Sequence, residues 1–160
     1  MKNSFYFIDD YMVLISKNGE KIKIDCFDFE KVKKHSWCVS KTGYAVANVN
    51  GKTKKMHRFL IGETEFGKVI DHINRNPLDN RRKNLRVCTY QENCRNCSNT
   101  KGRALPLGIS KTQNGKKYRV RIMVDRKEIC LGRYEKLEDA LLARYLGEQK
   151  YFCGFRYNKK

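Results

Sequence analysis

The residues from Lys68 to Cys97, KVIDHINRNPLDNRRKNLRVCTYQENCRNC, constrain the fold of this chain more than any other stretch. Two short apolar runs, at 69–70 and at 85–88, each predict a strand. The loop between them is polar, contains a proline and is rich in asparagine, which excludes regular structure there. Thr89 and Glu92 then form the spacing of a capping box, which begins a helix. The stretch therefore predicts a strand, a long loop, a second strand and a helix that carries Asn93.

The polar residues in this frame are not those that packing requires. His72, Asn84 and Asn93 follow one another at intervals across the predicted strands and helix, and Asp71 lies beside the first of them. In this pattern the segment from Met56 to Cys97 resembles the HNH nuclease family, in the variant whose third letter is Asn. It is similar to HNH homing endonucleases of phages and group I introns.

The resemblance implies a ββα-metal site with assigned roles. Asp71 and Asn93 would hold one divalent cation, His72 would be the general base, and Asn84 would orient the His72 ring. These residue types suit phosphodiester hydrolysis, because a histidine with a pKa near 6.5 can deprotonate water at neutral pH. A sparse set of oxygen ligands leaves positions for water and phosphate, which favours Mg²⁺, with Mn²⁺ as a substitute.

The charge of the chain points to a polyanionic partner. It has 35 Lys and Arg residues against 17 Asp and Glu, a net charge of +18. The excess is smallest over residues 61–100 and largest after residue 100. The basic run Arg81-Arg82-Lys83 lies in the predicted loop and is a candidate for contact with DNA. No apolar run is long enough for a membrane span, and the N-terminal residues do not predict a signal peptide.

Residues 1–60 predict small β structure with two Asn-Gly turns. Trp37 and Tyr44 are expected in its core. His57 is placed just before a short apolar helix at 59–61, where a structural hydrogen bond is the main interpretation and contact with phosphate the alternative.

The seven cysteines are irregularly spaced and indicate reduced thiols, not a disulfide framework. Cys94 and Cys97 form a single C-x-x-C pair, with Cys88 six positions earlier. Because no second pair is placed to complete a tetrahedral site, we expect the cysteines to be small buried apolar residues and zinc to be absent.

Beyond a predicted linker at 98–106, the segment from Lys117 to Val124 alternates between apolar and basic residues. Together with strands near 107–110 and 127–134 and a helix over 136–152, it predicts three antiparallel strands and one helix. Phrases such as Tyr118-Arg119-Val120-Arg121-Ile122 and Leu131-Gly132-Arg133-Tyr134 resemble the Apetala-two/ethylene-response-factor (AP2/ERF) DNA-binding domain. In that family the sheet enters the major groove, which implies that Arg119 and Arg121 contact bases or phosphates, supported by Lys111 and Arg133. A charged, solvated face is the alternative.

The sequence thus predicts an α+β chain with four parts. These are a β-rich N-terminal region (1–55), an HNH ββα-metal core (56–97), the linker (98–106), and a three-stranded antiparallel sheet packed on one helix (107–160). The predicted function is that of a metal-dependent HNH endonuclease, homing-type or nicking, acting on double-stranded DNA as a monomer or weak dimer. We expect no small-molecule cofactor and a cytoplasmic location in a bacterial or phage-infected cell.

Two other classes remain open. One is a DNA-binding regulator with an inactive HNH core, which the intact set of Asp71, His72, Asn84 and Asn93 disfavours. The other is a structural DNA binder that depends on zinc.

Overall fold

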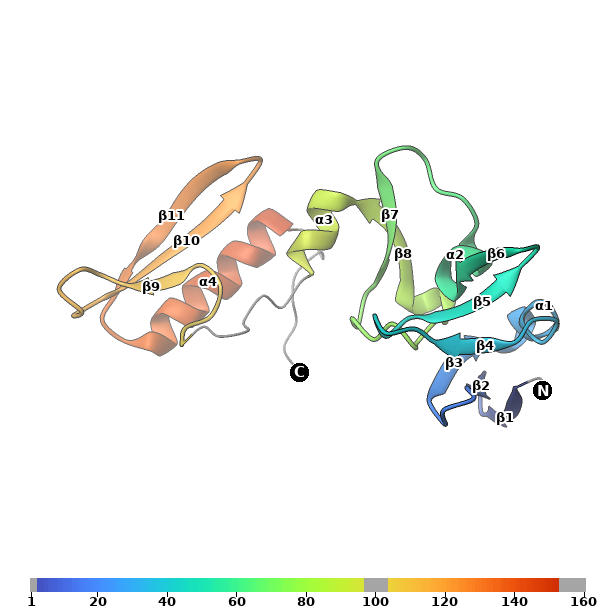
Figure 1. The fold of residues 1–160 in the computed structure, drawn as a ribbon. Coiled ribbons are helices and arrows are strands. Elements are labelled where there is room, and N and C mark those ends of the chain that lie inside the picture. The colour runs from blue at the N-terminus through green and yellow to red at the C-terminus, as the bar shows by residue number, and fades with distance from the viewer. Residues whose placement is uncertain (1–2, 97–103, 153–160) are drawn as a thin grey trace. The chain divides into compact units, whose positions relative to one another are not determined.

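The structure is a computed structural model that describes residues 3–96 and 104–152 of the 160-residue chain. The chain divides into two compact units, residues 1–93 and residues 94–160, which are described separately (Figure 1). The described residues form small antiparallel sheets and a few helices, so the expectation of a mixed, sheet-rich fold is confirmed. Residues 98–103 of the predicted linker (98–106) lie outside the described residues.

The first unit begins with a three-stranded antiparallel sheet of order β1-β2-β3. Its strands are β1 (Ser4–Ile8), β2 (Tyr11–Ile15) and β3 (Lys21–Asp25). The turn between β2 and β3 contains Gly19 with a φ of 86°, a conformation that costs glycine nothing and disfavours other residues. In β3, Ile22 and Ile24 are buried while Lys21 is exposed, the alternation of a strand with one buried face. The strand β1 was not predicted, because its residues do not alternate and lie exposed at the edge of the sheet.

A second antiparallel sheet, β4-β5-β6, follows a 3₁₀ turn and a short helix. These elements are η1 (Cys26–Asp28), α1 (Phe29–Val32), β4 (Trp37–Val39), β5 (Ala45–Val49) and β6 (Lys52–Lys55). Helix α2 (Met56–Ile61) comes directly after β6. His57 therefore lies inside this helix and not before it.

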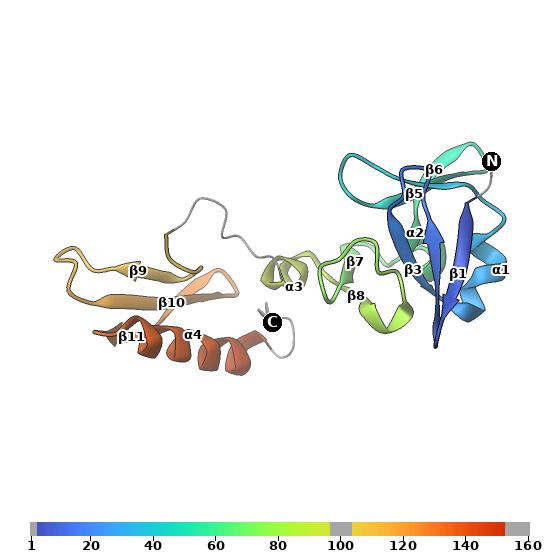
Figure 2. The ribbon, with the colours of Figure 1, turned by 90° about the horizontal axis from the view of Figure 1, so that it is seen from below.

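One hydrophobic core joins the two sheets and α2 (Figure 2). Trp37 is fully buried at its centre, and its indole N–H donates to the carbonyl of Val32 at 3.0 Å. Met56 and Leu60 of α2 belong to the same cluster, so residues on both sides of the predicted boundary at 55/56 share a core. Tyr44, expected in the core beside Trp37, is only half-buried and lies outside the hydrophobic cluster, where its ring contacts two histidine rings and Lys55.

The central stretch folds in the predicted order of strand, loop, strand and helix. Strand β7 (Lys68–His72) pairs antiparallel with β8 (Leu85–Thr89), and helix α3 (Tyr90–Arg95) follows at once. The 3₁₀ turn η2 (Arg82–Asn84) ends the loop between the strands. The capping box is confirmed, since the amide N–H of Thr89 donates to Glu92 Oε2 at 2.8 Å and that of Glu92 donates to Thr89 Oγ1 at 3.2 Å.

The second unit contains an antiparallel sheet of order β11-β10-β9 and one long helix. Its elements are β9 (Ile109–Lys111), β10 (Tyr118–Val124), β11 (Lys127–Tyr134) and α4 (Leu137–Phe152). Val120, Ile122 and Ile109 point to the core on one face of the sheet, where Ala140 of α4 packs. The register between β10 and β11 shifts at Val120/Arg121, which marks a β-bulge.

Two positions explain how closely α4 approaches this sheet. A methyl group added at Gly147 would overlap the side chain of Leu131, so the absence of a side chain at this position lets α4 pack closely on the sheet. Arg144 of α4 is buried, donates to the carbonyl of Arg121 and pairs with Glu148 at 2.7 Å. Arg144 thus ties the helix to β10 at the bulge. In the described ranges 3–96 and 104–152, no helix has the length and apolar character needed to cross a membrane.

Candidate active site and nucleic-acid interface

Asp71 and His72 are the last two residues of β7, and both are buried, with 7% and 6% of their surface exposed. Asp71 lies opposite Arg86 in the register of β7 and β8. The Arg86 guanidinium donates to Asp71 Oδ2 from Nε at 3.0 Å and from Nη2 at 2.8 Å. This cross-strand ion pair fixes the position of the carboxylate at the end of the strand.

The imidazole of His72 is held by a polar contact and by two rings. Its Nε2 lies 3.3 Å from Asn80 Oδ1, in the loop that follows β7. The His57 ring meets it edge-on with centroids 5.1 Å apart, and the Tyr44 ring lies 6.1 Å away. Burial lowers the pKa of His72 below its ordinary value of 6.5, although Asn80 and Asp71 oppose that shift. The imidazole is therefore neutral near pH 7 and can accept a proton.

His57 also contacts this site, and the sequence did not predict its contact with His72. It is 5% exposed and contacts Tyr44 edge-on at 5.4 Å as well as His72. Burial, followed by the charge of His72, lowers the pKa of His57 to about 3. His57 and His72 belong to elements separated in sequence, and no periodic pattern connects them. Only the position of His57 within the HNH-like segment offered a signal.

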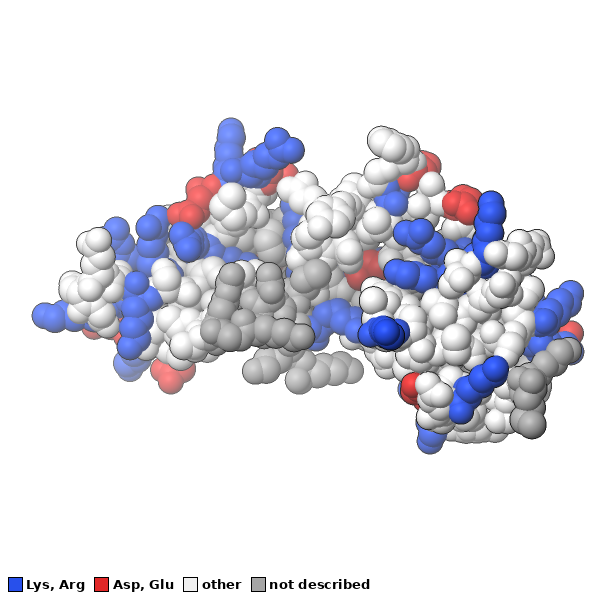
Figure 3. Space-filling model, in the orientation of Figure 1, with Lys and Arg blue, Asp and Glu red and all other residues white. Residues whose placement is uncertain are grey.

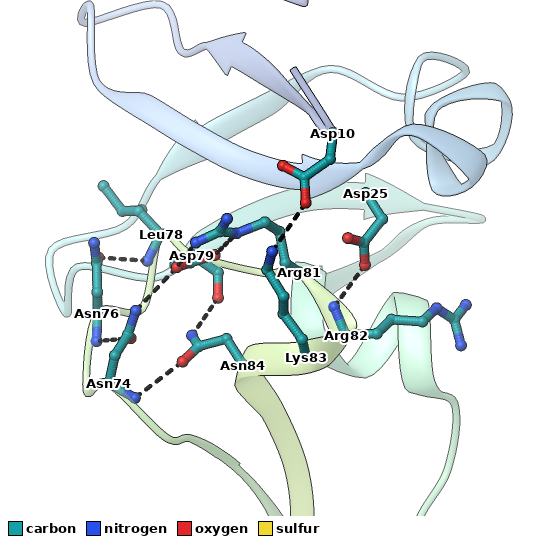
Figure 4. A network of polar contacts seen from close by, with 10 residues as sticks. All are labelled: Asp10, Asp25, Asn74, Asn76, Leu78, Asp79, Arg81, Arg82, Lys83 and Asn84. Carbon is teal, nitrogen blue, oxygen red and sulfur yellow. Dashed lines mark hydrogen bonds and ion pairs between the residues drawn. The ribbon is translucent and has the colours of Figure 1, made fainter. Parts of the chain in front are cut away.

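Asn84 closes the loop between β7 and β8 (Figure 4). Its amide donates to the carbonyl of Asp79 at 2.7 Å, and its Oδ1 accepts from the amide N–H of Asn74 at 2.9 Å. The loop so ordered carries Asn80, which contacts His72. That Asn84 orients the His72 ring stays a prediction, and the contacts of Asn84 suggest an indirect route through the loop.

The basic run Arg81-Arg82-Lys83 faces carboxylates of the first unit (Figure 4). Arg81 makes two hydrogen bonds to Asp79, both at 2.8 Å. Arg82 makes two bonds of 2.9 Å to buried Asp28, and its backbone N–H donates to Asp25 at 2.6 Å.

Lys83 pairs with Asp10 at 3.0 Å, and both side chains are mostly exposed. Contact of the three cations with DNA stays a prediction. The ion pairs of Arg81 and Arg82 also give these residues a structural role, because they fasten the loop to itself and to the N-terminal region.

Asn93 lies on α3, which the capping box starts immediately after β8. In residues 3–96 and 104–152, no three His, Cys, Asp or Glu side chains gather in a way that could hold a metal ion. The oxygen donors of Asp71 and Asn93 fit a hard cation that brings water and phosphate oxygens as its other ligands. They do not fit a structural zinc site. Cys88 is buried and Cys94 exposed, whereas Cys97 lies outside the described residues.

In the second unit, Arg119, Arg121 and Arg133 share the face of the sheet that α4 leaves uncovered. Arg119 and Arg133 are directly opposite each other in the register of β10 and β11. Lys111 pairs with Tyr118 in the register of β9 and β10. Tyr118 lies on the face that packs against α4, so the strand position of Lys111 is on that face and not on the face of the arginines. The structure therefore brings the three arginines together but not Lys111. On the side seen in Figure 3, Lys and Arg side chains lie over both units.

Comparison with known proteins gives one family match and one similar sequence. Residues 56–95, from α2 into α3, match a family model described as HNH endonuclease. The chain is 33% identical over 111 residues to an uncharacterized HNH endonuclease of Acanthamoeba polyphaga mimivirus. That alignment covers 62% of this chain and 59% of the relative, so it leaves about two fifths of the relative unmatched. No solved structure matches the chain. The family match ends before β9, so it supports the HNH segment and does not reach the sheet of the second unit.

Proposed function

We propose that this protein is a metal-dependent HNH endonuclease that hydrolyses phosphodiester bonds of double-stranded DNA. The observation that carries the proposal is the buried, neutral His72 next to Asp71 at the end of β7, inside the segment that matches the HNH endonuclease family. A neutral imidazole is what general-base chemistry on water at neutral pH requires.

In this proposal His72 accepts the proton of the attacking water. Its position is restricted by Asn80 on one side and by the rings of His57 and Tyr44 on the other. His57 acts as a positioning residue, since its edge-on ring limits how far the His72 ring can rotate. Its low pKa also keeps a second positive charge away from His72.

Asp71 and Asn93 would hold one divalent cation, with Mg²⁺ as the expected ion and Mn²⁺ as a substitute. When bound, such a cation polarises the scissile phosphate and stabilises the leaving oxygen. Arg86 holds the Asp71 carboxylate through Oδ2, which fixes its orientation as a ligand.

The second unit would supply site preference. Its three strands and one helix agree with the order predicted from the AP2/ERF-like phrases, and Arg119, Arg121 and Arg133 form a basic face. We propose that this face enters a groove of the DNA while the first unit cuts. One active site per chain would nick one strand, and a break in both strands would need a second chain or a second event.

The deciding experiment uses supercoiled plasmid. The purified chain should relax or linearise it with Mg²⁺ or Mn²⁺ and stop when EDTA is added, with His72→Ala protein as the control for a contaminating nuclease. Cleavage that continues undiminished in EDTA would exclude the metal mechanism. Binding to DNA without cleavage in any divalent metal would instead favour the regulator with an inactive core.

A further inference from the structure

Two arginines on the open face of the sheet in the second unit bind the same carboxylate. Arg119 Nη2 lies 2.9 Å from Glu128 Oε1, and Arg121 Nη1 lies 3.1 Å from Glu128 Oε2. Each oxygen of the carboxylate thus binds one guanidinium. All three side chains are partly exposed, so the arrangement is on the surface and open to a ligand.

The β-bulge makes this convergence possible. Arg119 is paired with Arg133 and Arg121 with Cys130, so the shift at Val120/Arg121 leaves one extra residue on β11. Gly132 at the bulge has a φ of 125°, which a larger residue would rarely adopt. Glu128 is opposite Met123, two positions along from Arg121, and its side chain lies on the same face as both arginines. Arg144, which donates to the carbonyl of Arg121, anchors this point of β10 to the helix.

We propose that Glu128 is a specificity-determining residue of this face, which holds Arg119 and Arg121 side by side for contact with DNA. This inference rests on the proposed DNA-binding function of the second unit. Each arginine gives a single Nη to Glu128, so the other donors of its planar fork remain for a base edge or a phosphate. The donors open to DNA are the Nη groups, because Arg119 Nε is buried and, in the ranges that the structure describes, has no acceptor.

The carboxylate has two effects that act in the same direction. It restricts the rotamers of two long side chains before DNA arrives, which lowers the entropy cost of a well-defined contact with a base. It also offsets positive charge on the face, which weakens attraction to phosphate at any sequence. Both effects raise the preference for a matched site over random DNA.

The test compares full-length variants bound to two duplexes in EDTA. One duplex is selected from a randomised library by the wild-type chain, and the other is its scrambled version. Glu128→Gln should bind the scrambled duplex about 2- to 10-fold more tightly at low salt, with a slope of log K against log salt steeper by about one. Its ratio of affinities for selected and scrambled DNA should fall by at least about 5-fold, part of the discrimination that one good base contact provides.

Glu135→Gln is the matched control. It removes the same charge from the same unit, at an exposed carboxylate that pairs with Lys117 at 3.2 Å. It should raise affinity for both duplexes alike and leave their ratio unchanged. If Glu128→Gln behaves like Glu135→Gln while the double variant Arg119→Gln/Arg121→Gln loses its preference, the role of Glu128 is refuted and DNA binding by this face stands. If the double variant equals the wild type, or the wild type selects no sequence, the proposed DNA-binding role itself fails.

Discussion

At the scale of single residues, burial is the largest influence on the pKa values of the two histidines in the candidate site. His72 and His57 are both buried in a chain with a large excess of positive charge, and burial lowers the pKa of each. A protonated imidazole there would be poorly solvated, so both rings stay neutral at physiological pH. Burial is therefore the main reason that the pKa of His72 is lowered, whereas the charges of Asp71 and Asp79 raise it.

His72→Ala should lower the rate of DNA cleavage by roughly 10²- to 10⁴-fold, the usual contribution of a general base. Its affinity for DNA should stay nearly unchanged, because the ring is buried and the basic surface is intact. Single-turnover cleavage and equilibrium binding measure the two effects separately. His35→Ala, which removes a histidine packed against Trp37 and Phe59, serves as a control. Near-normal cleavage by His72→Ala would mean that another group is the base.

His57 should make the stability of the first unit depend on pH. Its pKa is about 3 in the folded protein and near 6.5 in the unfolded chain, so below pH 6.5 the unfolded chain binds a proton that the folded protein does not. The free energy of unfolding should then fall with decreasing pH, by on the order of 1 kcal/mol per pH unit between about pH 6 and pH 4.

Urea unfolding of the wild type and His57→Gln across that range tests this expectation. The variant should lose less stability on acidification, since glutamine does not titrate. Parallel curves for the two proteins would show that His57 is not buried as the structure describes.

At the scale of elements, the loop between β7 and β8 is held by ion pairs that its sequence does not suggest. The basic run was expected to bind DNA, yet Arg82 makes two hydrogen bonds to Asp28, which is buried. Removing Arg82 would leave that carboxylate buried without its main partner, and such a change is costly. The position of the loop matters for activity because Asn80 contacts His72.

Arg82→Met should therefore destabilise the first unit by about 1–3 kcal/mol, a range that allows for the partial exposure of Arg82. Lys83→Met should cost much less than Arg82→Met, because the pair of Lys83 with Asp10 is exposed to solvent on both sides. Chemical denaturation of the two variants measures the difference.

The double variant Arg82→Met/Asp28→Asn separates the structural role of Arg82 from DNA contact. It removes both charges of the pair, so its affinity for DNA should match the wild type if the arginine is chiefly a tie between elements. A large loss of affinity in this variant would restore Arg82 as a DNA contact.

At the scale of the whole molecule, cutting and recognition should be separable. Each unit has its own hydrophobic cluster, one around Trp37 and one around Val120. The excess of positive charge is greatest after residue 100. If that part binds DNA as proposed, its binding should release counterions and so depend on salt.

A fragment ending near Thr100 should keep metal-dependent cleavage but act weakly and with little site preference. The full chain should bind more tightly, and its log K should fall more steeply with log salt. Binding and cleavage of the two proteins across a salt series provide the comparison. Equal affinity and equal salt slope would show that the second unit does not bind DNA.

The order of elements and several of their ends follow from local sequence alone. The capping box at Thr89 and Glu92, the bounds of β11 and the alternation along β10 depend on neighbouring residues, and these predictions are confirmed. The HNH-like spacing identified a segment that the family comparison also matches. Local patterns sufficed here because turn chemistry, capping and strand alternation act over a few residues.

Other features were decided only by tertiary structure. The contact of His57 with His72, the pairing of Arg82 with Asp28, and the convergence of Arg119 and Arg121 on Glu128 each join residues from different elements. The sheet face on which Lys111 lies depends on the register of β9 and β10. The placement of Arg133 and Glu128 on the same face depends on the β-bulge in β11. No short-range pattern encodes these contacts, because burial and partner choice arise only when separate elements pack together.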